Sequence, residues 1–364
     1  MTEVLLKELS NSDINWMSTT GCQQEIAAGT ILVQEGKAAD TLHIVLDGTL
    51  AVTVSQADNN PLSRAFAAIE GGETSGREIA RLSSGEIVGE ISFLGTRSTA
   101  TTVKAIEKSL VMSIPQQKLA AKLQQDVGFA SRFYRAIAIL LSDRLQSIVS
   151  QLTRSKLAQG QALRDMLFVL GGLNDSDIDW MIATGSRQKI AANTVLIHSG
   201  GPVDALYILL NGTMTVSVCE DERNPLARAF AVLEGSETSG REISRLSRGE
   251  IVGETPFIDA RLPSATVKTI EDSMVLSIPR QQLAAKLQQD VGFASRFYRV
   301  IATLLSNRLQ GMLSRLGYGR RVYSKGQPLD DNVEYEDELD SNVLDSMALA
   351  GTRFDWMLSR LRGI

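Results

Sequence analysis

Two patterns of apolar residues follow each other along this chain, one with the period of strands and one with the period of helices. Short runs rich in β-branched residues, separated by Gly and Asp, occur at 30–34, 41–46 and 49–54. Runs of about five residues between glycine-marked turns are typical of a compact antiparallel β-roll. After Gly128 the spacing becomes helical and the apolar positions form one stripe: Phe129, Phe133, Ile137, Leu141, Leu145, Ile148 and Leu152. This order predicts an α+β domain in which helices follow a small roll.

The whole pattern returns 164 positions later in the chain. The segment 119–135 recurs without change as 283–299. A match of this kind over a domain length indicates an internal duplication. The duplication predicts two tandem domains, a first copy at 1–155 and a second copy at 165–315.

A short helix is predicted at the start of each copy. Ser12 and Asp13 in the first copy, and Ser176 and Asp177 in the second, are candidates for its N-cap, because their side-chain oxygens can accept from unpaired N–H groups. Two more helices are predicted where a proline begins the segment, at 61–70 and 225–234.

The chain changes character after the second copy. Between Pro328 and Asp345 it carries eight acidic residues and no Lys or Arg, which predicts a solvated linker over 316–351. The segment 352–364 is predicted to be an amphipathic helix, with Phe354, Met357, Leu358 and Leu361 beside Arg353, Arg360 and Arg362. Two placements are open: Arg353–Arg362 docks in a groove of a protein partner, or it folds back onto the chain's own domains.

Composition narrows the class of protein. The 364 residues are 43% apolar and 22% charged, as in ordinary globular proteins of two domains. A net charge of −5 argues against a nucleic-acid partner, which requires a basic surface. The start lacks a signal-peptide pattern, the most apolar stretch at 136–141 is too short to span a bilayer, and only Cys22 and Cys219 are present. We therefore expect a cytoplasmic protein without membrane insertion.

Patterns of catalytic residues are missing from the sequence. It contains no Ser-His-Asp set, no P-loop and no Gly-x-Gly-x-x-Gly before a helix. His43 and His198 do not match across the repeat, so no paired metal site is expected. We expect a non-enzymatic protein without a metal or cofactor.

Two motifs in each copy resemble the cyclic nucleotide-binding domain family. The first is Gly36-x-x-x-Asp40-x-Leu42-x-Ile44-x-x-x-Gly48, which is repeated from Gly200 to Gly212. The second resembles the family's phosphate-binding cassette: Gly89-Glu90-Ile91-Ser92-Phe93 to Val103, and Gly253-Glu254-Thr255-Pro256-Phe257 to Val267. The tandem arrangement is similar to that of kinase regulatory subunits. The resemblance implies two antiparallel jelly rolls with flanking helices, and cAMP or cGMP as the ligand.

The resemblance also implies roles for the cassette residues. The Glu accepts a hydrogen bond from the ribose 2′-hydroxyl, backbone N–H groups at a short helix meet the phosphate, and an Arg ten residues after the Gly pairs with the cyclic phosphate. The candidate ligand-binding residues are Gly89, Glu90, Ile91, Ser92, Arg97, Ala100 and Thr101 in the first copy, and Gly253, Glu254, Thr255, Arg261, Ser264 and Ala265 in the second.

Both copies depart from the cassette at its arginine. Thr99 and Pro263 occupy that position, and Pro256 removes a further N–H from the second copy. Arg97 and Arg261 lie two residues earlier, on the same side of an extended segment but about 7 Å away. Loss of a charged hydrogen bond to a buried phosphate costs about 2–5 kcal/mol. The second copy is therefore the poorer candidate site.

Two functions remain open. In the first, the chain is a non-enzymatic regulatory sensor that couples ligand occupancy to partner binding. In the second, it is a degenerate, ligand-free adaptor or scaffold that docks through its surfaces and C-terminal tail. A transcription regulator of the catabolite-activator type is excluded, because the C-terminal region is acidic and too short for a helix-turn-helix. The helices that follow each roll pair either within one chain, as a pseudo-dimer, or between two chains.

Overall fold

The structure, a computed structural model, describes residues 3–54, 77–94, 99, 101–152, 170–219, 240–259, 261–315 and 341–362. The helices predicted at 61–70 and 225–234 lie outside the described residues, as does most of the predicted linker. The chain divides into two compact units. The first comprises Met1–Arg144 and Leu305–Asp345, and the second comprises Leu145–Leu304 and Ser346–Ile364.

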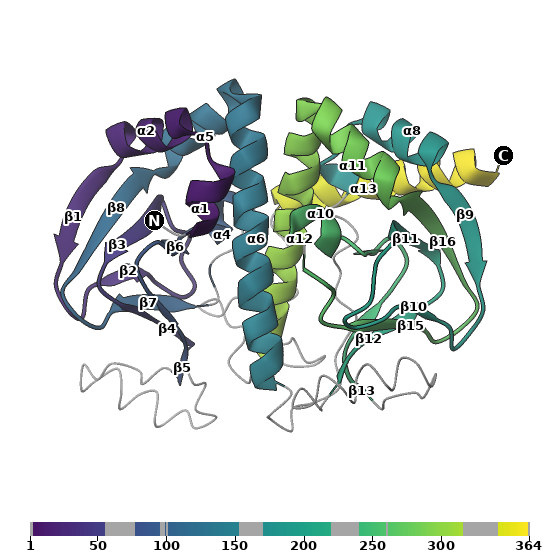
Figure 1. The fold of residues 1–364 in the computed structure, drawn as a ribbon, viewed down its shortest axis with the longest axis horizontal. Helices are drawn as coiled ribbons and strands as arrows, with labels where there is room; N and C mark the ends of the chain where they lie inside the picture. Colours follow the sequence, from purple (N-terminus) through teal and green to yellow (C-terminus); the bar gives the residue numbers. More distant parts are fainter. Residues whose placement is uncertain are drawn as a thin grey trace. The chain divides into compact units, whose positions relative to one another are not determined.

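The first unit contains a roll of two antiparallel sheets (Figure 1). Its strands are β1 (Cys22–Ile26), β2 (Ile31–Val33), β3 (Thr41–Asp47), β4 (Leu50–Val54), β5 (Arg77–Leu82), β6 (Ile87–Val88), β7 (Thr102–Ala105) and β8 (Ser109–Pro115). They pair in the orders β1-β8-β3-β6 and β2-β7-β4-β5. The helices of the first copy are α1 (Glu3–Glu8), α2 (Asn11–Thr20), α4 (Ile91–Leu94), α5 (Gln116–Gln125) and α6 (Val127–Leu152).

The second copy repeats this topology. Its strands are β9 (Ser186–Ile190), β10 (Val195–Ile197), β11 (Ala205–Asn211), β12 (Met214–Cys219), β13 (Gly240–Leu246), β14 (Ile251–Val252), β15 (Thr266–Thr269) and β16 (Ser273–Pro279), paired as β9-β16-β11-β14 and β10-β15-β12-β13. Its helices are α8 (Asp175–Thr184), α10 (Thr255–Ile258), α11 (Arg280–Gln289) and α12 (Val291–Arg315), and α13 (Ser341–Arg362) follows. The predicted α+β class and the duplication are confirmed.

The core of each roll forms between its two sheets. In β3, Leu42, Ile44 and Val45 are fully buried, and β3 is the partner of both β8 and β6. Apolar side chains from both sheets meet in one cluster: Ile26, Val33, Val45, Leu50, Leu82, Val88, Val103, Ala105 and Val111. A matching cluster fills the second roll. Burial of this kind is the main stabilising contribution in a small β domain.

Helix α2 of the first copy begins earlier than predicted. Its N-cap is Ser10, whose Oγ accepts from the N–H of Asp13 at 3.3 Å, while Asp13 Oδ2 accepts from the N–H of Ser10 at 2.8 Å. The N-cap prediction at Ser12 or Asp13 is therefore wrong, because Asp13 is the third residue of a capping box. Asp13 also accepts from Arg132 of α6 at 2.7 and 3.0 Å, which ties α2 to α6.

The second copy shows the same correction. Asn174, not Ser176 or Asp177, caps α8, and Asp177 Oδ2 accepts from the N–H of Asn174 at 2.8 Å. Asp177 in turn accepts from Arg296 of α12 at 2.6 and 2.8 Å. The same ion pair thus ties a short helix to a long helix in each copy. No helix in the described ranges is both long and apolar enough to cross a membrane.

Candidate functional site

The cassette of each copy begins at a glycine that no other residue replaces easily. Gly89 has a φ of +88° and Gly253 has a φ of +86°. A Cβ atom at Gly89 would lie 2.5 Å from the carbonyl oxygen of Thr41, and one at Gly253 would lie 2.6 Å from that of Ala205. Positive φ and this close approach both require glycine. The backbone therefore enters the cassette in the same way in both copies.

Glu90, the residue after Gly89, is buried and ion-paired. Its side chain is 3% exposed, and its Oε1 accepts a hydrogen bond from Nη1 of Arg144. The Nη2 of Arg144 donates to the carbonyl oxygen of Ile87 in β6. Charge-assisted hydrogen bonds of this kind are the strong ones in proteins. They join the cassette to α6, the long helix that carries Arg144.

The second carboxylate oxygen of Glu90 is available to a ligand. In the described part of the chain, Oε2 has no hydrogen-bond partner. A hydroxyl donor placed beside Oε2 would add a charge-assisted hydrogen bond, as the ribose role predicted for Glu90 requires.

Thr99, at the family's arginine position, closes a turn. Its side chain is buried, and Oγ1 lies 3.1 Å from the carbonyl oxygen of Gln34, 3.2 Å from that of Lys37 and 3.4 Å from that of Thr101. The N–H of Gly36 donates to the carbonyl oxygen of Thr99 at 2.8 Å. The hydroxyl proton is thus committed to backbone acceptors. Thr99 has no charge to offer a phosphate.

The remaining candidates of the first copy are placed in part. Ile91 is the first residue of α4, and Ser92 follows it with its hydroxyl oxygen 2.9 Å from the N–H of Ala39, which donates to it. Ser92 is buried. Arg97 and Ala100 lie outside the described residues, so their ligand contacts stay predictions.

The cassette helix of the second copy lacks a donor. Glu254 is buried at the N-cap position of α10, and Thr255 and Pro256 are the first two residues of that helix. A proline has no N–H. The second copy therefore offers one backbone donor fewer than the first, in which Ser92 stands at the same place.

The arginine of the second cassette already has an anionic partner. Nε of Arg261 donates to Oδ2 of Asp259 at 2.5 Å. Pro263 occupies the family's arginine position, and Ser264 and Ala265 lead from it into β15. Because Asp259 neutralises Arg261, this cassette is less suited to an anionic ligand.

The sequence did not single out Arg144. It stands among the apolar residues of α6 and recurs as Arg308 at the same place in the repeat. The sequence did offer one signal for Arg144: a cation beside an apolar stripe that recurs at the same position of the repeat. Its partner could not be read from the sequence, because Arg144 and Glu90 are 54 positions apart.

The described residues contain no group of three or more His, Cys, Asp or Glu side chains arranged to hold a metal ion. The first cassette offers a buried carboxylate for a hydroxyl, with turn and helix backbone around it.

Curated relatives match this chain at low identity. Lysophospholipase nte1 of Aspergillus oryzae is 22% identical over 291 residues, which are 75% of this chain and 17% of that protein. An uncharacterised NTE family protein of Mycobacterium tuberculosis is 22% identical over 137 residues, which are 38% of this chain and 20% of that protein. The chain thus spans a fifth or less of the length of these relatives.

Solved structures and a family model complete the comparison. The regulatory domain of Toxoplasma gondii PKA with cAMP is 17% identical, with a TM-score of 0.28, over 79% of this chain and 89% of that chain. Catabolite activator protein of Thermus thermophilus is 14% identical, with a TM-score of 0.33, over 52% and 76%. The model of the cyclic nucleotide-binding domain matches residues 23–126 and 187–290. The chain belongs to the cyclic nucleotide-binding domain family and carries two copies of its domain in tandem.

Proposed function

We propose that this chain is a non-enzymatic regulatory module whose first copy binds a cyclic nucleotide and passes its occupancy to α6. The observation that carries the proposal is the ion pair between Glu90 and Arg144, because it joins the cassette directly to a long helix. Glu90 contacts Arg144 directly, so a change in the hydrogen bonds of Glu90 alters those of Arg144 without any intermediate residue.

The ribose end of the ligand is assigned to Glu90. Its Oε1 is bound to Arg144, while Oε2 has no donor in the described part of the chain. The 2′-hydroxyl of a ribonucleotide supplies one donor to Oε2. Such a contact adds a hydrogen bond to a charged group, which contributes about 1.5–3 kcal/mol.

The phosphate end is assigned to basic residues of the first copy other than Thr99. Arg97 stands two positions before Thr99, and the exposed Lys37 lies in the turn that Thr99 closes. The second copy has Gly201 in place of Lys37, and its Arg261 is paired with Asp259. This charge difference supports one ligand per chain, bound in the first copy.

Occupancy changes a partner's affinity only if the ligand binds two states of the chain unequally. We expect Arg144 to make the two states differ, because it contacts both Glu90 and the carbonyl oxygen of Ile87. A ribose hydroxyl at Glu90 alters the balance of these contacts and hence the preferred position of α6. In lysophospholipase nte1 the matched segment is a minor part of the chain, which fits a module that regulates a separate catalytic part.

The second candidate function is a ligand-free adaptor. The observation in its favour is Thr99, whose hydroxyl serves the fold and whose side chain has no charge. In that case Glu90 and Arg144 are a structural ion pair, and the surfaces of the chain carry the function.

Calorimetric titration of the full chain with cAMP and with cGMP tests the proposal. We expect saturable binding of one ligand per chain, weakened at least about tenfold by Glu90→Gln, which removes a charged hydrogen bond. The matched control Glu254→Gln leaves the affinity unchanged. Arg97→Ala and Lys37→Ala weaken cyclic nucleotide binding and leave the binding of uncharged adenosine unaltered. Absence of heat at millimolar ligand, or equal losses from both Gln variants, would contradict the proposal.

A further inference from the structure

Residues 346–362 of the C-terminal helix α13 (yellow in Figure 1) belong to the second unit. Ala350, Phe354, Met357 and Leu361 are 1%, 2%, 1% and 7% exposed. Their spacing is that of one helical stripe. The helix begins at Ser341, before the predicted start at 352. Two placements were left open, and the structure shows the second of them: α13 folds back onto the chain's own second copy.

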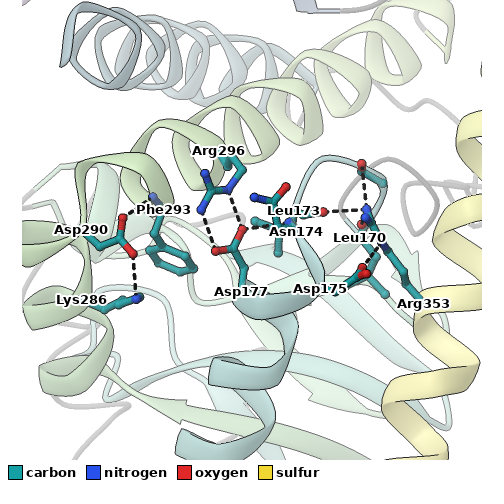
Figure 2. A network of polar contacts seen from close by, with 11 residues as sticks. Leu170, Leu173, Asn174, Asp175, Asp177, Lys286, Asp290, Phe293, Arg296 and Arg353 are labelled. Atoms are coloured by element: carbon teal, nitrogen blue, oxygen red, sulfur yellow. Dashed lines mark hydrogen bonds and ion pairs between the residues drawn. The ribbon is translucent and has the colours of Figure 1, made fainter. Parts of the chain in front are cut away.

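Arg353 fills a socket at the entrance to the second copy (Figure 2). Its Nε donates to Oδ1 of Asp175 at 2.9 Å. Its Nη1 donates to the carbonyl oxygens of Leu170 at 3.1 Å, Gly171 at 3.3 Å and Leu173 at 2.6 Å. The guanidinium thus binds three backbone carbonyls in the segment just before α8.

Charged residues on both flanks of α13 continue the match. Nη2 of Arg248 donates to Oδ1 of Asp355 at 3.2 Å, and its guanidinium carbon lies 4.9 Å from the centre of the Phe354 ring. On the opposite flank Arg360 lies 3.8 Å from Asp179 of α8. Opposite charges at these points fix both the register and the direction of α13.

The carbonyl end of α13 has its own contact. Nη1 of Arg187 in β9 donates to the carbonyl oxygen of Leu361 at 3.3 Å. The last carbonyls of a helix have no intrahelical partner and carry partial negative charge. Arg187 therefore recognises the end of a helix, independently of the side chain at 361.

The residues that form this seat are those at which the two copies differ. Gly171, Asp175, Asp179, Arg187 and Arg248 in the second copy correspond to Lys7, Asn11, Asn15, Gln23 and Ser84 in the first. Leu170, whose carbonyl oxygen accepts from Arg353, is 1% exposed, whereas its counterpart Leu6 is 54% exposed. The first copy therefore lacks the charges that hold α13 and leaves the corresponding leucine uncovered.

We propose that α8, β9 and the turn before β14 form a helix-docking site specific to the second copy, and that α13 is its dedicated and exchangeable occupant. Exchange is feasible because residues 316–340 separate α13 from α12 and because Asp175 and Asp355 are about three-quarters exposed, at 74% and 77%. The site binds a guanidinium, an apolar stripe and a helix C-terminus together. A protein partner for Arg353–Arg362 is compatible with this site only after α13 leaves it.

Docking of α13 also affects how α8 is held against α12 in the second copy. Asp175, which receives Arg353, is the first residue of α8, and Asp177, two residues further, is bound to Arg296 of α12 (Figure 2). The guanidinium of Arg353 thus stabilises the start of α8, and α8 in turn positions the start of α12. The docked helix is a latch on the second copy, and the first copy carries no counterpart among the described residues.

A labelled peptide with the sequence of residues 341–364 tests the site, with fluorescence anisotropy as the measurement. The receiver is the full chain with Arg353→Ala and Phe354→Ala, which weaken its own latch. We expect this variant to bind the peptide at least about tenfold more tightly than the unaltered chain, whose site is filled. A peptide that itself carries Arg353→Ala serves as the control and does not bind.

Adding Asp175→Asn and Asp179→Asn to the receiver completes the test. These are the residues that the first copy carries at the same positions, so the fold tolerates them. We expect them to abolish peptide binding. Equal binding with and without these two changes, or no binding to the weakened chain, would overturn the proposal. Hydrogen exchange in the Arg353→Ala chain gives a second readout: faster exchange at 170–184 with unchanged exchange at 6–20 supports the latch, and unchanged exchange at both contradicts it.

Discussion

The two copies agree where residues hold the fold and differ in the cassette and at the face that receives α13. Asp13 with Arg132 and Asp177 with Arg296 make the same bidentate ion pair. The ring centroid of Trp16 lies 5.4 Å from that of Phe129, and the ring centroid of Trp180 lies 5.4 Å from that of Phe293, both at an interplanar angle of 61°. After duplication the frame was kept, so the differences between the copies point to separate functions.

Those differences fall at two places. In the cassette, the first copy has Ser92 where the second has Pro256, and Gly95 where the second has Asp259. At the face that receives α13, charges are present in the second copy and missing from the first. The first copy is thus the better candidate for a ligand, and the second copy is the one that its own tail restrains.

Loss of a latch contact should produce the largest effect, in the second copy alone. Phe354→Ala removes a ring that is 2% exposed, and we expect it to lower the free energy of unfolding of the second copy by about 3 kcal/mol. Denaturant unfolding followed through Trp180, with Trp16 and Trp356 changed to Phe, measures it. The same experiment followed through Trp16 should show no change, and an equal loss there would show that α13 also stabilises the first copy.

The glycines at the cassette entrance should give the next largest effect, and an equal one in both copies. Gly89→Ala and Gly253→Ala each place a methyl group within 2.6 Å of a carbonyl oxygen, at a positive φ. We expect a loss of about 2 kcal/mol in the copy that carries the change. Gly36→Ala is the control, because its φ is +79° but no atom lies within 4 Å of the added methyl. It should cost about 1 kcal/mol.

The smallest effect concerns the caps of the long helices. Asp126 accepts from Nζ of Lys122 and from the N–H of Phe129, both at 2.8 Å, and Asp290 makes the same two contacts with Lys286 and Phe293. The hydrogen bond from the lysine, followed by that from the backbone N–H, holds the pKa of each aspartate below its usual 3.8. We expect Asp126→Ala and Asp290→Ala each to cost about 1 kcal/mol at pH 7.

The pH dependence of that loss follows from the direction of the shift. A lowered pKa means that the folded state favours the carboxylate, so its contribution is complete above the unfolded value and disappears as the pH falls through the folded value. The difference between each variant and the unaltered chain should therefore shrink below pH of about 3. Unfolding curves at pH 7, 4 and 2.5 measure it, and a difference that grows in acid would contradict the assigned contacts.

Local patterns in the sequence predicted the frame of this molecule well. The β-branched runs between glycines became β2, β3 and β4, and the apolar stripe after Gly128 became α6. These elements follow from spacing alone. The N-cap of α2 was misplaced because Ser10, Ser12 and Asp13 are all good capping residues, and only the geometry shows that Asp13 sits at the third helical position.

The candidate site was predictable only in part. The cassette motif located Glu90, but its partner Arg144 lies on a distant helix and carries no motif of its own. The seat of α13 was hidden for the same reason, since Asp175, Arg187 and Arg248 come from three separate elements. Contacts between elements far apart in the chain depend on the tertiary fold, which a periodicity does not encode.

Hydrogen exchange of the full chain with and without saturating cAMP tests the division between the copies most directly. The account predicts slower exchange at 87–94 and 137–144, around Glu90 and Arg144 in the first copy. It predicts no change at 251–258, the matching cassette segment of the second copy. Protection confined to 251–258, or protection at neither segment, would contradict the assignment of the ligand to the first copy.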